Sequence, residues 1–432
     1  MIDIKFIRQN PEEVKEDLNK RGVDVGLVDK VLSLDERRRH VLKELEEGRA
    51  EINKKSKIMP SPAEIESLKK IKEKIKILES ELELVEKDLN ENLYQLPNLP
   101  LPDAPVGKDE KSNKILYEVG KRPKFNFEPK KHYELGESLD IIDIERAAKV
   151  SGSRFGYLKG LGARLEFALI NFALARLTDK KWVGKITKKN KLNVLLLNGV
   201  SGKEFIPVIP PVLINEKAMK GMGYIDTEAD REERYFLEKD KEYLVGTSEQ
   251  SIGPMHMDEI FDGKDLPIRY LAFSSCFRRE AGSYGKDVRG IMRVHQFDKL
   301  EMFSYSKPED SESEFKFLLA VQEELVKELS LPYRAVQLST GDLARPSAAT
   351  FDIETWFPGL GEYKETHSCS NTTDFQSRRL NIRLRRKNGG LEFVHMLNGT
   401  AFAVGRSILA ILENYQQKDG SIKIPKALKR YF

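Results

Sequence analysis

Phe277-Arg278-Arg279-Glu280 precedes a glycine-bearing, mixed-charge stretch, residues 281–290, which leads into IMRVHQFDKLE, residues 291–301. Both flanks alternate apolar and polar residues as strands do, so the pattern predicts an antiparallel hairpin with a long turn. Guanidinium groups suit phosphate oxygens, an aromatic ring can stack on a purine, and such a loop can cover a substrate. One face of the hairpin would present four such side chains to a nucleotide: Arg278, Glu280, Arg293 and Phe297.

A short Arg-Arg-Glu run is also compatible with a basic surface hairpin that carries an ordinary mobile loop. Other parts of the chain supply what a nucleotide site would still need. The segment resembles motif 2 of the class II aminoacyl-tRNA synthetases, and HQFDKLE, residues 295–301, is similar to the version found in seryl-tRNA synthetases.

Length and composition fit one large core and an accessory unit. The chain has 432 residues, of which 33% are charged, and a net charge of +4. Its two cysteines, Cys276 and Cys369, have no metal-binding spacing, so we expect neither a disulfide framework nor a zinc site. The N-terminus lacks an apolar signal core, and no run of about 18 apolar residues occurs. We expect a soluble, cytoplasmic protein with no membrane partner.

Two long helical patterns occupy the first hundred residues. Asn10-Pro11-Glu12-Glu13 predicts a helix start with Asn10 as its cap. Apolar residues then recur at heptad spacing through residues 31–52 and, more strictly, through residues 68–89. Ile58-Met59-Pro60-Ser61-Pro62 cannot continue a helix and should reverse the chain. The pattern predicts an antiparallel α-helical coiled-coil arm that projects from the body.

Eight lysines and three acids lie between residues 53 and 76, around the expected tip of the arm. Lysines on an exposed helix usually serve solubility alone, whereas a basic arm can also grip an RNA backbone through its phosphates. Seryl-tRNA synthetases carry an N-terminal arm that this one resembles in position and heptad pattern, and theirs embraces the long variable arm of tRNA. The resemblance implies a tRNA-binding arm over residues 1–100, with five candidate contacts: Lys54, Lys55, Lys57, Lys69 and Lys70.

Prolines mark the end of the arm. Residues 96–102 read LPNLPLP, and Pro105-Val106-Gly107-Lys108 extends the break, which places a domain boundary near residues 96–110. Residues 101–432 mix helices and short strands without regular βαβ alternation, and they contain neither a P-loop nor a convincing Rossmann fingerprint. The pattern predicts an α+β catalytic domain built on an antiparallel sheet flanked by helices, with Ala163–Leu177 as one amphipathic helix.

Gly202–Leu213 is largely apolar and is interrupted by prolines, which confine it to a sheet edge or to the end of a strand. Such an edge can form a subunit seam, or its prolines can simply blunt it without any partner. The stretch resembles class II motif 1, whose proline corresponds to Pro211 and builds the dimer interface. The resemblance implies a homodimer.

Thr247-Ser248-Glu249 places a hydroxyl and a carboxylate two residues apart. At a strand end both would point to one side and could hold a small zwitterion, although a plain helix cap accounts for most Thr-x-Glu runs. In seryl-tRNA synthetases this Thr-x-Glu binds serine. The resemblance also implies that Glu301, expected to close the second hairpin strand, receives the hydroxyl of serine and helps to exclude alanine.

Glu365-Thr366-His367-Ser368 begins a run of oxygen-bearing side chains of the kind that suits Mg²⁺ bridging nucleotide phosphates. It resembles the family motif Glu-x-x-Ser-Cys-Ser-Asn, which implies Glu365 and Ser368 as Mg²⁺ ligands. His367 falls at a variable position of that motif, and we expect it to be structural.

Residues 398–406, NGTAFAVGR, run into an apolar helix. An arginine at a helix N-terminus favours a phosphate, and a buried strand, turn and helix with a structural arginine is the alternative. The segment resembles motif 3, which implies Arg406 as a nucleotide-binding residue and Thr400 as a serine contact.

The resemblance spans nearly the whole chain and implies a two-step ligase. The serine carboxylate would attack the α-phosphate of ATP, giving seryl-adenylate, and the 3′ end of tRNA(Ser) would then take the seryl group; charging of tRNA(Sec) stays open. Positioning and charge compensation suffice for this chemistry, with Mg²⁺ as the cofactor. The implied catalytic residues are Arg278, Arg406 and Glu365; the serine-binding ones are Thr247, Glu249, Arg278, Glu301 and Thr400; the ATP-binding ones are Arg278, Glu280, Arg293, Phe297, Glu365, Ser368 and Arg406.

Other interpretations stay open. A class II-like ligase that loads a carrier protein would keep the catalytic motifs but would have no reason to keep a basic arm. A catalytically inactive RNA-binding relative would keep the arm and lose the motif arginines, and here Arg278, Arg293 and Arg406 are all present. A coiled-coil scaffold explains only the N-terminal part.

Overall fold

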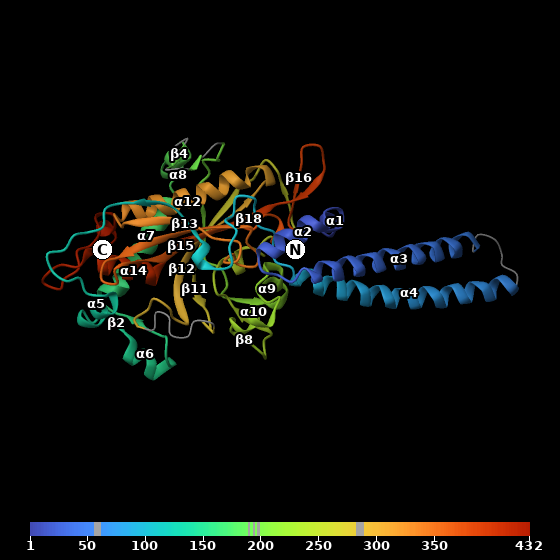
Figure 1. Cartoon of the computed structure of the whole chain (residues 1–432), viewed down its shortest axis with the longest axis horizontal. Helices are drawn as coiled ribbons and strands as arrows, with labels where there is room; N and C mark the ends of the chain where they lie inside the picture. The colour runs from blue at the N-terminus through green and yellow to red at the C-terminus, as the bar shows by residue number, and fades with distance from the viewer. Residues whose placement is uncertain (56–61, 189–190, 193–194, 197–198, 282–288) are drawn as a thin grey trace. The chain divides into compact units, whose positions relative to one another are not determined.

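The structure is a computed structural model that describes residues 1–55, 62–188, 191–192, 195–196, 199–281 and 289–432 (Figure 1). Contacts within the chain divide it into two compact units, Met1–Leu99 and Pro100–Phe432. Lys57 and the expected reversal at residues 58–61 lie outside the described residues. Within the described residues, no helix combines the length and the apolar character needed to cross a membrane.

The first unit is helical. Its elements are α1 (Ile4–Gln9), α2 (Pro11–Lys20), α3 (Gly26–Lys55) and α4 (Pro62–Gln95). The two long helices, α3 and α4, lie antiparallel (Figure 1). Val41 and Leu45 of α3 pack against Leu78 of α4, which is the apolar seam that the heptad spacing predicts. The expected antiparallel coiled coil is confirmed.

Ion pairs along the seam fix the antiparallel register of the two helices. Arg38, early in α3, pairs with Glu86, late in α4, at 3.0 Å. Lys74, early in α4, pairs with Glu44 of α3 at 2.8 Å. These pairs are half-buried or exposed and remain in contact with solvent, so each contributes only a few tenths of a kcal/mol, at most about 1 kcal/mol. They select the register more than they add stability.

The helix start at Pro11 is confirmed, but the role expected of Asn10 is wrong. Proline is the first residue of α2, and Asn10 occupies the N-cap position without a side-chain capping hydrogen bond. Its Nδ2 instead donates to the carbonyl of Phe6 at 3.3 Å, at the end of α1. The short α1, which precedes the expected start, competes for the asparagine side chain.

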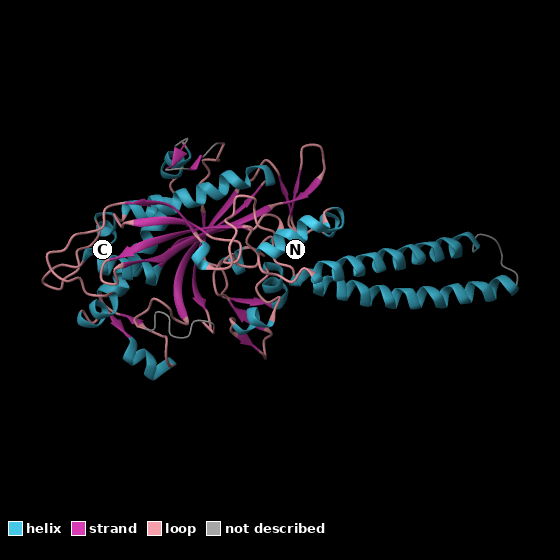
Figure 2. Cartoon of the chain, viewed as in Figure 1, coloured by secondary structure: helices cyan, strands magenta, loops and turns pink. Residues whose placement is uncertain are grey.

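The second unit is built on a large β-sheet, drawn in magenta in Figure 2. The sheet has eight strands in the order β1-β13-β14-β15-β18-β12-β11-β6. Neighbouring strands are antiparallel, except that β6 pairs with β11 in parallel. The strands are β1 (Lys114–Val119), β6 (Ile206–Val208), β11 (Ile268–Phe277), β12 (Gln296–Ser306), β13 (Tyr333–Gln337), β14 (Ala349–Phe357), β15 (Glu362–Asn371) and β18 (His395–Ala403). The expected antiparallel sheet is confirmed, and so is the hairpin, in which β11 pairs with β12.

Three helices pack on the sheet: α7 (Leu161–Leu177), α12 (Ser311–Glu328) and α14 (Val404–Tyr415). They share one apolar core with the sheet, into which Leu300 and Met302 of β12 project. The expected helix at Ala163–Leu177 is confirmed and starts two residues earlier. Because side chains alternate along a strand, Lys299 and Glu301 are left for the opposite face.

Smaller elements surround this sheet. The helices are α5 (His132–Ser138), α6 (Ile144–Ser151), α8 (Lys180–Thr187), α9 (Glu216–Met222), α10 (Glu228–Glu232), α11 (Glu249–Ile252) and α13 (Phe375–Leu380), with short 3₁₀ turns η1 (Glu110–Ser112), η2 (Pro308–Asp310) and η3 (Lys426–Tyr431). The strands are β2 (Ile142–Asp143) with β3 (Tyr157–Leu158), β4 (Lys191–Leu192) with β5 (Leu195–Leu196), β7 (Leu213–Asn215) with β9 (Glu242–Leu244) and β8 (Phe236–Leu237), and β10 (Ile260–Asp262) with β16 (Arg383–Arg385) and β17 (Leu391–Phe393).

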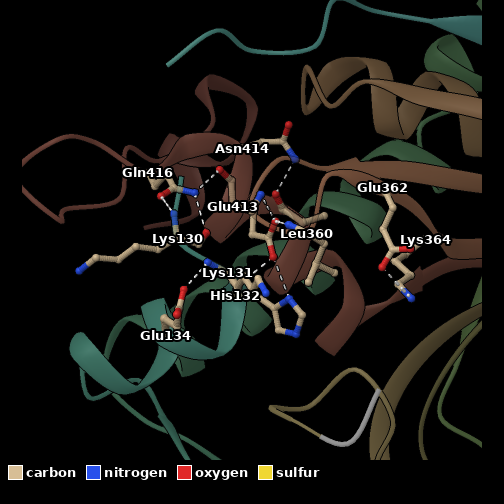
Figure 3. Close-up of polar contacts among 12 residues, drawn as sticks. Lys130, Lys131, His132, Glu134, Leu360, Glu362, Lys364, Glu413, Asn414 and Gln416 are labelled. Carbon is tan, nitrogen blue, oxygen red and sulfur yellow. Dashed lines mark hydrogen bonds and ion pairs between the residues drawn. The ribbon is translucent and has the colours of Figure 1, made fainter. Parts of the chain in front are cut away.

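A buried carboxylate ties α14 to the first residue of α5 and to the loop between β14 and β15 (Figure 3). Oε1 of Glu413 accepts the backbone N–H of His132 at 2.8 Å and lies 2.8 Å from Nδ1 of the same residue. Oε2 accepts the backbone N–H groups of Gly359 at 2.7 Å and Leu360 at 3.3 Å. Fully satisfied, such a buried charge fixes its neighbours in place. The helix fixed in this way carries Arg406 in its first turn.

Candidate active site

A cavity of about 570 Å³ lies at the polar face of β12. It brings together side chains from β12, β15 and β18, from the first turn of α14, and from the segments that follow β9 and β11. Its walls include every residue that the sequence assigned to serine, ATP or Mg²⁺: Thr247, Glu249, Arg278, Glu280, Arg293, Phe297, Glu301, Glu365, Ser368, Thr400 and Arg406. Residues far apart in the sequence therefore meet at one hollow.

The four nucleotide-site residues of the hairpin share the cavity, but the expectation that one strand face presents them is wrong. β11 ends at Phe277 and β12 begins at Gln296, so only Phe297 of the four lies in a strand. Glu280 has a left-handed backbone with φ of 52°, a conformation that a strand residue does not adopt. Its Oε2 accepts from Nη1 of Arg293 at 2.7 Å, so a side-chain ion pair joins the two flanks.

Arg278 is held at the mouth of the hairpin. Its backbone N–H donates to the carbonyl of His295 at 2.9 Å, which continues the strand pairing by one step. Its Nε donates to the carbonyl of Gly246 at 3.0 Å, and its guanidinium carbon lies 5.2 Å from the ring centre of Phe297. A Cβ on Gly246 would lie 3.2 Å from Nη1 of Arg234 and 3.5 Å from Cγ of Arg278, so the absence of a side chain leaves room for both arginines.

Thr247 and Glu249 both line the cavity, although they do not lie at a strand end as expected. β9 ends at Leu244, and Glu249 is the first residue of the short helix α11. Ser248 occupies the N-cap position, with no side-chain capping bond. The alternative interpretation, that Thr247-Ser248-Glu249 is only a helix cap, is therefore not supported either. Glu249 is buried and accepts a hydrogen bond from the hydroxyl of Tyr224.

Glu301 lies in the middle of β12 and does not close it as expected. Its carboxylate pairs with Lys299, and Oγ1 of Thr400 lies 3.5 Å from its Oε2. Burial raises the pKa of Glu301 to about 7; the charge of Glu249 acts in the same direction, while Lys299 opposes it. Nζ of Lys299 also donates to Oγ1 of Thr247 at 3.3 Å. Three of the groups assigned to serine, Thr247, Glu301 and Thr400, are thus connected through Lys299 and Glu301.

Irregular pairing of β15 brings Glu365 and Ser368 to the same cavity. Residues three apart in a regular strand face opposite sides. The register shifts between Glu365, which pairs with Glu354, and His367, which pairs with Ile353, so one extra residue corrects the parity. Both oxygen-bearing side chains then reach the cavity. Carboxylate and hydroxyl oxygens are donors that fit Mg²⁺.

His367 points away from this set. It is buried, its Nδ1 lies 2.9 Å from Oγ1 of Thr366, and its ring meets that of Phe402 edge-on at 5.6 Å. Burial lowers the pKa of His367 to about 3. The ring is therefore neutral at physiological pH and packs within the sheet, in keeping with the structural role expected for it.

Several polar residues of the cavity were not predicted from the sequence, among them Tyr224, Arg234, Lys299 and Asn398. Lys299 carried a usable signal, because it alternates with Phe297 and Glu301 along one strand. Asn398 likewise precedes Thr400 by two on β18. The other two come from loops whose sequences give no such period. Burial and the charge of Arg278 lower the pKa of the Arg234 guanidinium.

The remaining predicted residues lie outside the cavity. Pro211 is exposed and sits between the edge strand β6 and β7. In the arm, Lys54 and Lys55 lie in the last turn of α3, while Lys69 and Lys70 lie on α4. All four are exposed except Lys55, which is half-buried beside Glu51 at 2.6 Å.

Comparison with known proteins agrees with this geometry. Residues 1–100 match the family described as Seryl-tRNA synthetase N-terminal domain, and residues 235–415 match the tRNA synthetase class II core domain (G, H, P, S and T). A serine–tRNA ligase from Thermodesulfovibrio yellowstonii is 44% identical over 444 residues, a match that covers 100% of this chain and 98% of that protein. The chain belongs to the seryl-tRNA synthetase family.

Two solved seryl-tRNA synthetases share the fold. The enzyme from Pyrococcus horikoshii, complexed with ATP, superposes with a TM-score of 0.89 at 41% identity, covering 100% of this chain and 98% of the other. The cytoplasmic serine–tRNA ligase from Naegleria fowleri, in complex with AMP, gives a TM-score of 0.85 at 33% identity, covering 100% and 97%. The family and fold that the motifs indicated are confirmed. Membership of the seryl-tRNA synthetase family accounts for both units, which a scaffold does not.

Proposed function

We propose that this chain activates L-serine with ATP and transfers the seryl group to the 3′ end of tRNA(Ser). Its membership of the seryl-tRNA synthetase family supports the reaction. The observation that carries the proposal is the single cavity in which two acceptor carboxylates, Glu249 and Glu301, meet the guanidinium groups of Arg278 and Arg406. The carboxylates suit the ammonium and hydroxyl groups of a small amino acid, and the guanidinium groups suit phosphates.

Serine would bind at the Thr247, Glu249 and Glu301 end of the cavity. Glu249 would face the ammonium group, and Glu301 with Thr400 would receive the hydroxyl. Arg278 lies between this end and Phe297, where it can neutralise charge on both the serine carboxylate and the α-phosphate. Holding these two groups in line supplies most of the acceleration that such a displacement needs.

ATP would occupy the Phe297, Arg293 and Arg406 end. Phe297 would stack on adenine, with Glu280 beside the purine or ribose, and the two arginines would hold the outer phosphates. Both arginines now contact carboxylates, Arg293 that of Glu280 at 2.7 Å and Arg406 that of Glu365 at 3.1 Å. Triphosphate binding would therefore exchange a carboxylate partner for a phosphate one. Mg²⁺ bound with ATP would neutralise phosphate charge, and its protein donors would be Glu365 and Ser368.

The arm and the site of action complete the proposal. Lys54, Lys55, Lys69 and Lys70, with Lys57, would contact tRNA phosphates without reading bases, and residues 1–100 and 101–432 would form the tRNA-binding and catalytic domains. Because such a grip depends on RNA shape, tRNA(Sec) is to be tested beside tRNA(Ser). A ligase of protein synthesis would act in the cytoplasm.

We further propose a homodimer through the edge strand β6. Ile206 and Ile209 are 52% and 85% exposed, and Phe167 on α7 is 65% exposed. Both α7 and β6 contact β11, so these apolar side chains belong to one region of the second unit. Exposed apolar side chains grouped at a sheet edge favour a partner subunit over a blunted edge, and Pro211 would lie in that interface.

Serine-dependent exchange of pyrophosphate into ATP tests the catalytic assignment. Arg278→Ala should lower kcat/KM by about a thousandfold, as loss of a charge-stabilising donor does in other enzymes, and should leave tRNA binding in a filter assay intact. Arg279→Ala is the matched control, because that exposed neighbour does not line the cavity. Normal exchange in Arg278→Ala would contradict the role. A panel of amino acids run with the wild type would test serine itself.

A further inference from the structure

Lys299 is a buried cation to which neither the sequence analysis nor the proposed reaction assigns a role. It precedes Glu301 by two residues on β12, and the side chains of the two residues are 11% and 1% exposed. Removing such a pair from water costs several kcal/mol per ion unless the geometry is good. The cost of burying Lys299 at the serine end of the cavity therefore points to a role for this lysine in the site.

The contacts of Lys299 give that account. Its Nζ pairs with Oε2 of Glu301 and donates to Oγ1 of Thr247 at 3.3 Å. It thus touches the group assigned to the serine hydroxyl and a group from the Thr-x-Glu run. Three other charged or polar groups face or adjoin the same carboxylate, from α11, the segment after β11, and β18: Glu249, Arg278 and Thr400. The buried thiols of Cys276 on β11 and Cys369 on β15 also interact with it electrostatically, and burial raises the pKa of both thiols, so they stay neutral.

We infer that Lys299 is a positioning residue that sets the specificity for serine, an inference that rests on the proposed function. Lys299 would do so by holding Glu301 ionised and directed at the substrate hydroxyl. An ionised carboxylate only accepts hydrogen bonds. It therefore selects an amino acid whose Cβ carries a donor, as serine does and alanine does not. A hydrogen bond to a charged group is also about twice as strong as one between neutral groups.

Loss of the cation would leave the carboxyl neutral. Burial and the charge of Glu249 both raise the pKa of Glu301, which reaches about 7 even with Lys299 present. Without Lys299 that pKa would rise further, and the protonated acid would dominate at neutral pH. The pocket would then lose the stronger hydrogen bond to the serine hydroxyl. It would also lose its selectivity for a substrate that donates a hydrogen bond. Raising the pH would restore both.

The test is the pH dependence of KM for serine in pyrophosphate exchange by the full-length chain. In the wild type, KM for serine should rise as the pH falls through about 7. Lys299→Met should move this rise upward by about one pH unit or more. Its preference for serine over alanine should fall about tenfold at pH 7 and recover at pH 9. Lys299→Arg, which keeps the charge, should keep the wild-type midpoint.

Two controls separate this role from a merely structural one. Lys264→Met removes an exposed lysine from an ion pair with Asp262 and should change nothing. Glu301→Gln cannot titrate, so Lys299→Met added to it should cause no further loss of selectivity. The inference would be overturned if Lys299→Met raised KM for serine equally at every pH, or raised KM for ATP as much as KM for serine. It would also be overturned if the effects of Lys299→Met and Glu301→Gln were fully additive, or if Lys299→Arg showed the same pH profile as Lys299→Met. Absence of serine-dependent exchange in the wild type would instead refute the proposed function.

Discussion

Arg406 and Glu365 form an ion pair at the wall of the cavity, with Nη1 of the arginine 3.1 Å from Oε2 of the glutamate. The same Nη1 donates to the backbone carbonyl of Glu365 at 3.0 Å. The first turn of α14 is thereby tied to the start of β15 by two bonds, of which only one uses the carboxylate. The Glu365 side chain is 47% exposed, so its oxygens are accessible to an incoming ion.

Glu365→Gln should weaken the response to Mg²⁺ more than it weakens the fold. The backbone bond to Arg406 does not depend on the carboxylate and should persist in the variant. The Mg²⁺ concentration that gives half-maximal pyrophosphate exchange should rise by about ten- to a hundredfold, as for loss of other metal-site groups. Glu362→Gln on the same strand, exposed and paired with Lys364 at 3.1 Å, is the control and should respond as the wild type does. An unchanged Mg²⁺ requirement would remove Glu365 from the metal site.

The hairpin shows how far the sequence could go. Alternation on both sides of residues 281–290 led to the correct prediction of two paired strands. On the second side, however, the alternating residues 293–297 lie mostly before β12, and β12 itself is buried on both faces from Lys299 onward. The same period misplaced Arg293, which lies before β12, and its apparent alternation comes from a loop. The group was nevertheless found in one cavity, since the left-handed turn at Glu280 and its bond to Arg293 restore the proximity that the strand face had implied.

Bulges were the feature that no pattern could supply. An extra residue in β15 decides that Glu365 and Ser368 share a face, and a similar shift in β18, at Ala401, places Thr400 opposite Glu301. A bulge arises from the pairing of two strands, so it has no signature within either one. Only the family resemblance carried that information. Tyr224 and Arg234 could not be predicted for a similar reason. They reach the cavity from loops, whose conformation depends on tertiary packing and leaves no periodic pattern in the sequence.

Removing the Glu413 carboxylate should destabilise the second unit strongly. Glu413→Ala leaves the buried donor of His132 and the half-buried donors of Gly359 and Leu360 without this acceptor (Figure 3). We expect a loss of about 3–5 kcal/mol in the free energy of unfolding, as for other broken buried charge networks. Glu413→Gln, which keeps one acceptor oxygen, should lose less.

Tryptophan fluorescence during urea unfolding measures this effect. The two tryptophans of the chain, Trp182 and Trp356, both lie in the second unit, so the signal reports on that unit alone. Glu362→Gln serves again as an exposed control. A shift for Glu413→Ala no larger than that of the control would mean that the cluster in Figure 3 contributes no net stability.

Glu166 predicts a stability that falls with rising pH. It lines a smaller cavity of about 270 Å³ together with Asp298. Burial, and then its hydrogen bond with the Asp298 carboxyl, raise the pKa of Glu166 to about 8. Between its ordinary pKa near 4.5 and about 8, the folded chain keeps a proton that the unfolded chain has lost. This contribution is therefore complete below the lower value and is lost as the pH rises through the upper one.

Glu166→Gln should flatten that dependence. The amide stays neutral at every pH, so the variant should gain melting temperature relative to the wild type as the pH rises from 5 to 9. Thermal scans followed by tryptophan fluorescence give the comparison, with Glu362→Gln as an exposed carboxyl that should track the wild type. Parallel curves for Glu166→Gln and the wild type would show that the carboxyl is ionised in the folded chain.

The arm lysines should matter for tRNA and not for serine activation. A variant with Lys54, Lys55, Lys69 and Lys70 changed to alanine loses four positive charges near the tip of the α3 and α4 pair. If each contacts a phosphate, the slope of log affinity against log salt should fall by about 3, and kcat/KM for tRNA should drop by about a hundredfold at physiological salt. Serine-dependent pyrophosphate exchange without tRNA should stay at the wild-type rate, since the residues that line the cavity belong to the other unit.

Four lysines of the second unit provide a matched control for the arm variant. Four exposed lysines near its start supply the same change in charge: Lys111, Lys114, Lys121 and Lys124. Because long-range attraction depends on total charge while phosphate contacts depend on position, the control should lower tRNA affinity only slightly and leave the salt slope almost unchanged. Equal losses in the two variants would mean that the arm attracts tRNA only by its overall charge. A loss of exchange in the arm variant would mean that these lysines act on the catalytic cavity as well.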